Sequence, residues 1–572
     1  MIRILAIWTH LEVVRSSTPK AMTETARRRK KHARSAAGCG ICRARHVRCD
    51  ETRPSCNECV RTGRHCDGYS SSRIPNGPSN SLDRPVRSVL PLIHHTGTAL
   101  LALSKNMEPS AQRALQYFQF ETAEQFSGCF QDEFWTTLVL QISQQEDCVC
   151  HALIALATLH EHFRDKHSSL PKTIVQSSAA RETGIDLPQR QQYDRAAKHY
   201  TKAIGLLQSH IFSKGFDNLE VTLLCCLLCA GFEILRGFYN AAQTHIQGGI
   251  TIIAKWQSQE SGIRGTSPSS PKGYLVRRTL APMFSRLAMQ ATLFSDVQPT
   301  CSKNHSSLIS CTADLGERGH RFESLTLARD AIHSLLWQIF FLPTRGHLKT
   351  NVKSNRSRNK RRADFAMRLD EWYAALTGYL NTVKTQEYIG GDRGKRRAAT
   401  SSLMLYYKAA RVMISTCLQD DEMMFDDFED DFRHIVNEAE DLLLPLAYQS
   451  LSTEQCQRYQ AKVSHFSLES GIVPVLYYVA LKCRVPQIRY RALALMSDTP
   501  NRREGVWESA AAALVAGQIV EIEERRREGN ELPVSARVDV IRVRVYLENR
   551  NLVLQCGRRG KEDCKIKRQL WW

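Results

Sequence analysis

The chain has 572 residues and a formal net charge of +20, from 78 Lys and Arg against 58 Asp and Glu. Hydrophobic residues make up 42% of it and charged residues 24%, the balance of an ordinary globular protein, which excludes a fibrous or wholly disordered chain. A chain of this length is expected to hold roughly two to four domains.

The N-terminal stretch from Ile2 to Val14 is apolar enough to suggest a targeting peptide. His10 and Glu12 interrupt it, and no small-residue cleavage site follows, so we do not expect secretion. Met22 is a second plausible start, which would make residues 1–21 an extension of the gene model.

Residues 1–34 are expected to form a disordered, basic N-terminal region. It holds a run of five basic residues that is a candidate nuclear localisation signal: Arg27, Arg28, Arg29, Lys30 and Lys31. Binding to the DNA backbone explains the same run, and both uses are compatible. We therefore expect the protein in the nucleus.

Six cysteines follow within 28 residues, and they are the most informative feature of the chain. Each half of the motif has two cysteines with two residues between them and a third cysteine after six more: Cys39, Cys42 and Cys49, then Cys56, Cys59 and Cys66. Tetrahedral zinc takes four ligands, so two ions need eight ligand positions. Six sulfurs supply eight only when two of them bridge, and the spacing therefore predicts a binuclear cluster with two Zn²⁺ per chain.

Disulfide bonds are the alternative use of so many cysteines. They need an oxidising compartment, and the sequence gives no secretory signal that leads to one. The surrounding arginines also favour thiolates, which are the form that binds metal. We favour the zinc cluster.

The stretch from Cys39 to Tyr69, CGICRARHVRCDETRPSCNECVRTGRHCDGY, resembles the fungal binuclear zinc cluster of transcription factors. The resemblance implies a DNA-binding module over residues 35–69, built of two short metal-bound helices. It also implies that Cys39 and Cys56 bridge the ions, with the other four cysteines as terminal ligands. Asp50 and Pro54 stand where the family has them.

The charge of this region indicates a polyanionic partner. From Arg27 to Cys66 there are twelve Lys or Arg against three Asp or Glu. Two zinc ions and six thiolates would add −2, which leaves about +7 on a small module. No Phe, Tyr or Trp lies between Cys39 and Cys66, although single-strand binders stack bases on such rings. Double-stranded DNA is therefore favoured over RNA.

Base-edge contacts carry the sequence information of such a complex, and a short helix in the major groove would make them. The resemblance assigns base reading to Arg45 and His46. The family more often has Lys at the second position, which offers three donors where neutral His offers one donor and one acceptor. A GC-rich triplet half-site is expected by analogy. The predicted contacts to the DNA backbone are Arg43, Arg48, Arg61 and Arg64.

Residues 70–107 are expected to form a flexible linker, because SSSRIPNGPSNSLDRPVRS is rich in Ser, Pro, Gly and Asn. Pro91 breaks the apolar run nearby, and no heptad pattern persists for the roughly three or four repeats of a coiled coil. This leaves monomeric DNA binding, or a homodimer formed through the large domain.

From about residue 108 onward apolar residues recur at helical spacing. We predict an all-α regulatory domain of about a dozen helices over residues 108–555, and a C-terminal tail over 556–572. The helical patterns are Tyr193–Leu207, Leu219–Leu235, Ala241–Trp256, Leu280–Phe294, Ala363–Tyr379, Phe432–Leu446 and Val506–Ile522. Irregular insertions are expected at 164–190, 257–278 and 345–362. The basic run Arg356 to Arg362 is interpreted as an exposed loop.

The longest apolar stretch here, Val221 to Phe232, is far shorter than the roughly 20 residues of a membrane helix, so no membrane partner is expected. Cys225, Cys226 and Cys229 lie in it, and we expect them to act as small core residues. The pattern of the cysteines outside the cluster does not suggest further metal.

The large region also resembles the second type of fungal transcription factor helical domain, in three stretches: FWTTLVLQISQQEDCVCHALIALATLHEHF, YDRAAKHYTKAIGLL and LLCCLLCAGFEILRGFYNAAQTHIQGG. The resemblance implies a regulatory domain that receives a signal or a partner, with no established catalysis. His151, His160 and Glu161 are expected to serve helix packing and the surface.

Other functions stay open. Asp426 to Asp430 fits DDxxD, the magnesium-diphosphate motif of all-α terpenoid synthases, although their second metal motif is missing. The same acidic run, interleaved with Met and Phe, also resembles an activation segment, but a solvated helix start is favoured. A zinc module that binds no DNA is the remaining alternative.

The sequence thus predicts a zinc-dependent, sequence-specific transcription factor of fungal type, and not an enzyme. It would regulate genes of RNA polymerase II and contact the transcription machinery. The cluster would bind DNA and the helical domain would regulate.

Overall fold

The computed structural model of the chain describes residues 50, 52, 55–62, 107–130, 133–168, 187–214, 218–262, 271–294, 321–340, 352–386, 393–416, 422–443, 464–529, 532–538, 540–546, 551–558 and 561–571. These residues belong to two units of the chain, divided near residue 92. The described part of the small unit contains helix α3 (Asn57–Arg61), and everything from Met107 onward belongs to the large unit.

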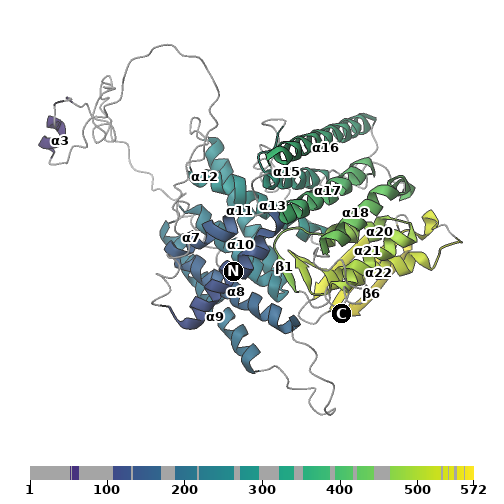
Figure 1. Cartoon of the computed structure of the whole chain (residues 1–572), viewed down its shortest axis with the longest axis horizontal. Coiled ribbons are helices and arrows are strands. Elements are labelled where there is room, and N and C mark those ends of the chain that lie inside the picture. Colours follow the sequence, from purple (N-terminus) through teal and green to yellow (C-terminus); the bar gives the residue numbers. More distant parts are fainter. Residues whose placement is uncertain are drawn as a thin grey trace, which may run out of the picture. The chain divides into compact units, whose positions relative to one another are not determined.

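The large unit begins with helices (Figure 1). In chain order they are α5 (Pro109–Tyr117), η1 (Phe118–Thr122), α6 (Ala123–Ser127), η2 (Gly128–Phe130), η3 (Phe134–Leu138), α7 (Val139–Gln145), α8 (Asp147–Ser168), α9 (Leu187–Lys214), α10 (Leu219–Arg236), α11 (Tyr239–Gly262), α12 (Pro271–Leu275), η4 (Val276–Leu280) and α13 (Ala281–Phe294). α8 lies along both α9 and α10, and α10 lies along α11.

α10 is the centre of this half. Every residue from Leu219 to Leu235 is buried except Glu220, as expected for a helix that is apolar on all sides. It ends at Gly237, whose φ of 85° favours glycine, and the N–H of Phe238 closes the end on the carbonyl of Glu233. The helix predicted over 219–235 is confirmed, and its three cysteines are core residues, as predicted.

The second half adds a layer of helices and two small sheets. The elements are α15 (Leu325–Phe340), α16 (Val352–Gln386), α17 (Arg393–Thr416), η7 (Glu422–Phe428), α18 (Glu429–Leu443), β1 (His465–Ser467), α20 (Val473–Lys482), α21 (Pro486–Asp498), β2 (Arg502–Glu504), β3 (Trp507–Glu508), α22 (Ser509–Glu524), η9 (Val534–Ala536), β4 (Val540–Tyr546), β5 (Asn551–Arg558) and β6 (Lys561–Trp571). α15, α16 and α17 lie side by side (Figure 1).

A buried cluster of charges joins distant parts of the large unit. Arg286 on α13 donates to Asp330 on α15 over 2.5 Å and to Glu469, after β1, over 2.7 Å. Arg286 and Asp330 are each about 3% exposed, so these ion pairs are shielded from water. The short sheet next to them has the order β1, β2, β3, with β1 parallel to β2 and β2 antiparallel to β3.

The C-terminal end differs from the predicted tail. β4, β5 and β6 form an antiparallel sheet, and β5 crosses the predicted boundary at residue 555. Leu552 and Leu554 point to the same face and are fully buried against Val515 and Ile519 of α22. The large unit is therefore mainly helical, as predicted, but it ends in strands that pack on its last helix.

The predicted insertions are partly wrong. α16 begins at Val352, so the basic run Arg356 to Arg362 is helical and not a loop. Lys and Arg are good helix formers, and no Pro or Gly interrupts this run. α8 and α9 likewise extend into the insertion predicted at 164–190, and α11, α12 and η4 extend into the one predicted at 257–278. Residues 169–186 and 263–270 fall outside the described residues.

Candidate functional site

Two of the six predicted zinc ligands lie in the described part of the chain. Cys56 directly precedes α3 and Cys59 lies in its first turn. Both side chains are fully buried, although α3 has only five residues, and the N–H of Cys59 donates to Cys56 Sγ over 3.4 Å. Two buried thiols one helical turn apart, one of which accepts a backbone N–H, are suited to binding zinc as thiolates. These two residues fit the predicted cluster.

Asp50 fixes the start of α3. Its carboxylate accepts hydrogen bonds from the Thr52 hydroxyl over 2.7 Å and from the N–H of Asn57 over 3.2 Å. The Thr52 hydroxyl and the backbone N–H groups of Asn57 and Glu58 hold the pKa of Asp50 below its ordinary value. The sequence marked Asp50 as a family position, but the spacing gave no sign that it caps this helix.

Arg61, a predicted contact to the DNA backbone, lies at the end of α3. Its side chain is 75% exposed and donates to Glu58 Oε1 over 3.0 Å. A phosphate could reach the guanidinium, but it would compete there with the Glu58 carboxylate. The ion pair therefore offsets part of the Arg61 charge at this surface.

The other predicted site residues lie outside the described residues. These are the zinc ligands Cys39, Cys42, Cys49 and Cys66, the DNA contacts Arg43, Arg45, His46, Arg48 and Arg64, and the localisation run Arg27, Arg28, Arg29, Lys30 and Lys31. The predicted linker up to residue 106, in which no coiled coil is expected, lies outside them as well.

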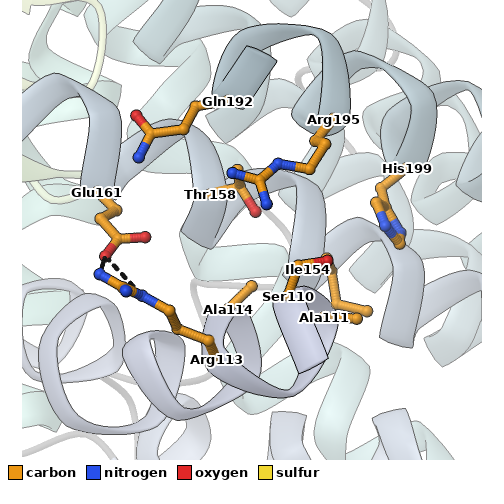
Figure 2. Close-up of a pocket in the computed structure, with 10 residues that line it drawn as sticks. All are labelled: Ser110, Ala111, Arg113, Ala114, Ile154, Thr158, Glu161, Gln192, Arg195 and His199. Carbon is orange, nitrogen blue, oxygen red and sulfur yellow. Dashed lines mark hydrogen bonds and ion pairs between the residues drawn. The ribbon is translucent and has the colours of Figure 1, made fainter. Parts of the chain in front are cut away.

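The large unit has a polar pocket of about 130 Å³ between α5, α8 and α9. Figure 2 shows Gln192, Arg195 and His199 of α9 on one side, and Arg113 paired with Glu161 on the other. Arg113 donates to Glu161 over 2.6 Å, so this Glu serves an ion pair at the rim.

The histidines flagged in the sequence are packing residues, as expected. His160 is fully buried, and its Nδ1 lies 2.9 Å from the Thr122 hydroxyl. Burial lowers the pKa of His160 to about 3, with a smaller effect from the nearby Arg164 charge. His151 Nδ1 lies 2.9 Å from His199 Nδ1, and burial lowers the pKa of His151 to about 4. Both rings are therefore neutral at neutral pH.

The terpenoid-synthase alternative loses its support. Asp426 and Asp427 lie in the 3-10 segment η7, whereas Asp430 lies in α18, so the three carboxylates do not share one face of a helix. Asp426 Oδ1 accepts from Arg484 Nε over 2.7 Å. An ion pair with Arg484 engages this carboxylate.

The activation-segment alternative is also not supported. Phe425 and Phe432 are 8% and 0% exposed, and both rings pack against Tyr478. Their apolar side chains are thus part of the core. Glu429 begins α18, in agreement with the favoured helix start.

A small module with zinc-binding cysteines and a large helical unit define the class of zinc-cluster regulators. The model of the fungal Zn(2)-Cys(6) binuclear cluster domain matches residues 37–74. The model of the fungal specific transcription factor domain matches residues 113–420, more than half of the chain. The chain therefore belongs to the family of fungal transcription factors with a zinc cluster.

Its relatives include named regulators. The chain is 30% identical over 230 residues to the transcription regulator lscL of Purpureocillium lilacinum. The matched stretch covers 38% of this chain and 48% of that protein. It is 29% identical over 236 residues to the aspercryptin biosynthesis cluster-specific transcription regulator atnN of Emericella nidulans, covering 39% and 35%. It is 32% identical over 114 residues to the transcriptional regulatory protein moc3 of Schizosaccharomyces pombe, covering 20% of each.

The chain thus spans about half the length of these relatives or less. No solved structure is significantly similar to it. Among the helices that the structure describes, none combines the length and apolar character needed to cross a membrane.

Proposed function

We propose that the chain is a zinc-dependent, sequence-specific transcription factor that acts in the nucleus on genes of RNA polymerase II. The observation that carries this is the buried pair Cys56 and Cys59 at the start of a helix capped by Asp50, within a region that matches the fungal cluster domain. It acts by binding and not by catalysis.

The six cysteines would hold two zinc ions, with Cys39 and Cys56 as the bridging ligands. The ions supply no reaction; they fix the fold of a module too small to have a core of its own. Asp50 positions α3 beside Cys56, and Arg61 lies at the surface of that helix, where a phosphate can reach it.

Arg45 and His46 would read base edges in the major groove, and Arg43, Arg48 and Arg64 would join Arg61 on the backbone. A GC-rich triplet is the proposed half-site. The run Arg27 to Lys31 would direct nuclear import.

The module is proposed to span residues 35–69, followed by a linker over 70–107 and the regulatory domain from 108. The domain would receive a regulatory signal, contact the transcription machinery and provide any surface for a homodimer. Its match to the transcription factor domain model supports this assignment.

A selection from randomised duplexes with the full chain, with and without a chelator, tests the proposal. We expect zinc-dependent enrichment of a GC-rich triplet. The same chain is also offered RNA in competition with the duplexes. Equal retention of RNA and DNA would instead favour a zinc module with another partner, and so would enrichment of no sequence while zinc is bound.

A further inference from the structure

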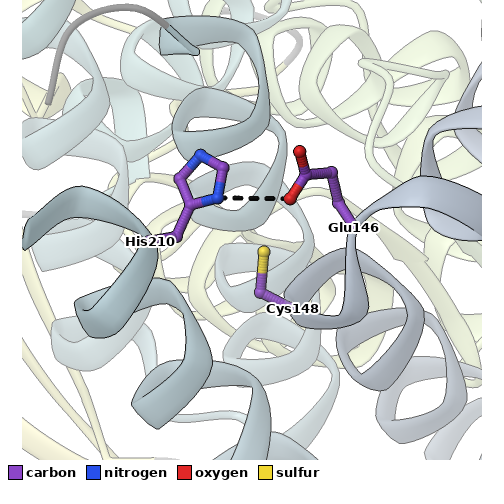
Figure 3. Close-up of side chains that lie close together, drawn as sticks. All are labelled: Glu146, Cys148 and His210. Carbon is purple, nitrogen blue, oxygen red and sulfur yellow. Dashed lines mark ion pairs between the residues drawn. The ribbon is translucent and has the colours of Figure 1, made fainter. Parts of the chain in front are cut away.

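Three side chains with metal-binding atoms meet in the large unit, away from the cysteine motif. Glu146 lies between α7 and α8, Cys148 in the first turn of α8, and His210 near the end of α9. Figure 3 shows the three side chains converging, and their ligand atoms all lie within 4.8 Å of one another. Cys148 is 3% exposed and His210 7%.

The spacing of these atoms suits a zinc ion. His210 Nδ1 lies 3.2 Å from Glu146 Oε2. Two ligands at about 2.0–2.1 Å from zinc, at a tetrahedral angle, lie about 3.3 Å apart, and a sulfur ligand lies about 3.6 Å from a nitrogen ligand. The pair already has the required separation, and Cys148 needs to approach by about 1.2 Å at most.

A second sulfur adjoins this group. Cys225 on α10 is hydrogen-bonded to Cys148 through the two thiols, and it is 1% exposed. Thiolate, imidazole and carboxylate are the three ligand types that zinc prefers, and four of them complete a structural site. Cys225 is not among the three residues whose ligand atoms lie within 4.8 Å of one another, so its thiol has to move toward them to fill the fourth position.

We propose that Glu146, Cys148 and His210, with Cys225 as the fourth ligand, bind one zinc ion in the regulatory domain. The ion would join α8, α9 and α10, which lie side by side. Because Glu146 is 17% exposed while the others are buried, this carboxylate forms the solvent side, where the ion enters. The site goes beyond DNA binding, because it links the packing of the regulatory domain to zinc supply.

The zinc content of the purified full chain, after saturation with zinc and desalting, tests this site. We expect Cys148→Ser and His210→Gln to hold one zinc ion fewer per chain than the wild type. Cys226→Ser is the matched control, because Cys226 is a neighbouring buried cysteine of α10 outside the group, and it should hold as much zinc as the wild type. Equal zinc in all four proteins would overturn the proposal.

A second measurement does not depend on zinc bound by the cluster, or on whether Cys148→Ser and His210→Gln fold. Replacement of all six cluster cysteines by Ser leaves the large unit unchanged, and this protein should still bind one zinc ion and unfold at a higher temperature when zinc is added. No bound zinc and no shift in melting temperature would show that His210 and Glu146 form only a hydrogen-bonded pair. Failure of DNA binding would leave either result unaffected.

Discussion

The N–H of Asn57 donates a hydrogen bond to Asp50 Oδ2 over 3.2 Å, and this bond joins the two halves of the cysteine motif. Asp50 follows the third cysteine and Asn57 follows the fourth. Thr52 strengthens the link, because its hydroxyl donates to Asp50 and accepts from the N–H of Asn57 over 3.1 Å. Protein hydrogen bonds therefore hold the halves together in addition to the metal.

Asp50→Ala should weaken zinc binding by about tenfold, because groups that orient metal ligands typically contribute at least that much. Competition with a chromophoric chelator measures the effect. Asp50→Asn is the control, since its side-chain oxygen can still accept from Asn57 and should retain most of the affinity. Equal loss in both variants would show that the charge, and not the cap, is what counts.

Glu58→Gln should tighten DNA binding a few-fold at low salt, because it releases Arg61 from its ion pair and removes a negative charge from the module. Arg61→Ala should weaken binding to all sequences alike and reduce the salt slope by about one. Binding isotherms at several salt concentrations measure both. An unchanged slope for Arg61→Ala would exclude a phosphate contact.

His160 should make the large unit sensitive to acid. Its pKa of about 3 in the fold compares with about 6.5 when unfolded, so the unfolded chain binds more protons between these values. Stability from this residue is present above pH 6.5 and is lost as the pH falls, by about 2 kcal/mol between pH 7 and pH 5.

Denaturant unfolding at pH 7 and pH 5 measures this loss, and comparison with His160→Gln isolates the histidine from other groups. The loss should be smaller in the variant by about 2 kcal/mol. The same loss in both proteins would mean that His160 does not stay neutral in the fold.

Glu523→Gln should destabilise the large unit by about 3 kcal/mol, because it leaves the charge of Arg489 buried with a weakened partner. Arg489 is 0% exposed and Glu523 1%, and the Glu523 carboxylate also accepts from Arg537 over 3.3 Å and from the N–H of Val538 over 2.9 Å. Chemical denaturation gives the change in unfolding free energy.

Glu521→Gln on the same helix is the matched control. Glu521 pairs with Arg525 at the surface and should contribute no more than about 0.5 kcal/mol. Equal effects of the two substitutions would show that burial does not govern how much these ion pairs contribute to the free energy of unfolding.

The sequence was most informative where a pattern repeats locally. Apolar spacing over several turns predicted the helices α9, α10 and α11. The spacing of the cysteines marked Cys56 and Cys59, before and within α3, as candidate zinc ligands. The sheet at the C-terminus was missed although β4 alternates Val with Arg. Its stability depends on contact with α22, which no local pattern shows.

The zinc-binding group in the regulatory domain could not be predicted for the same reason. Glu146 and His210 are far apart in the chain, and the packing of α8 along α9 brings them together. Cys225 lies in an apolar run and looked like a core residue, which it also is. Only the tertiary structure places its sulfur beside Cys148.

The most direct test of the account is the affinity of the full chain for its selected duplex, measured with zinc and after zinc removal, for the wild type and for Cys56→Ser/Cys59→Ser. We expect tight, sequence-dependent binding by the zinc-loaded wild type alone, with wild-type affinity in the control Cys226→Ser. Unchanged, sequence-specific binding by the double variant or by the metal-free wild type would contradict the zinc-cluster account.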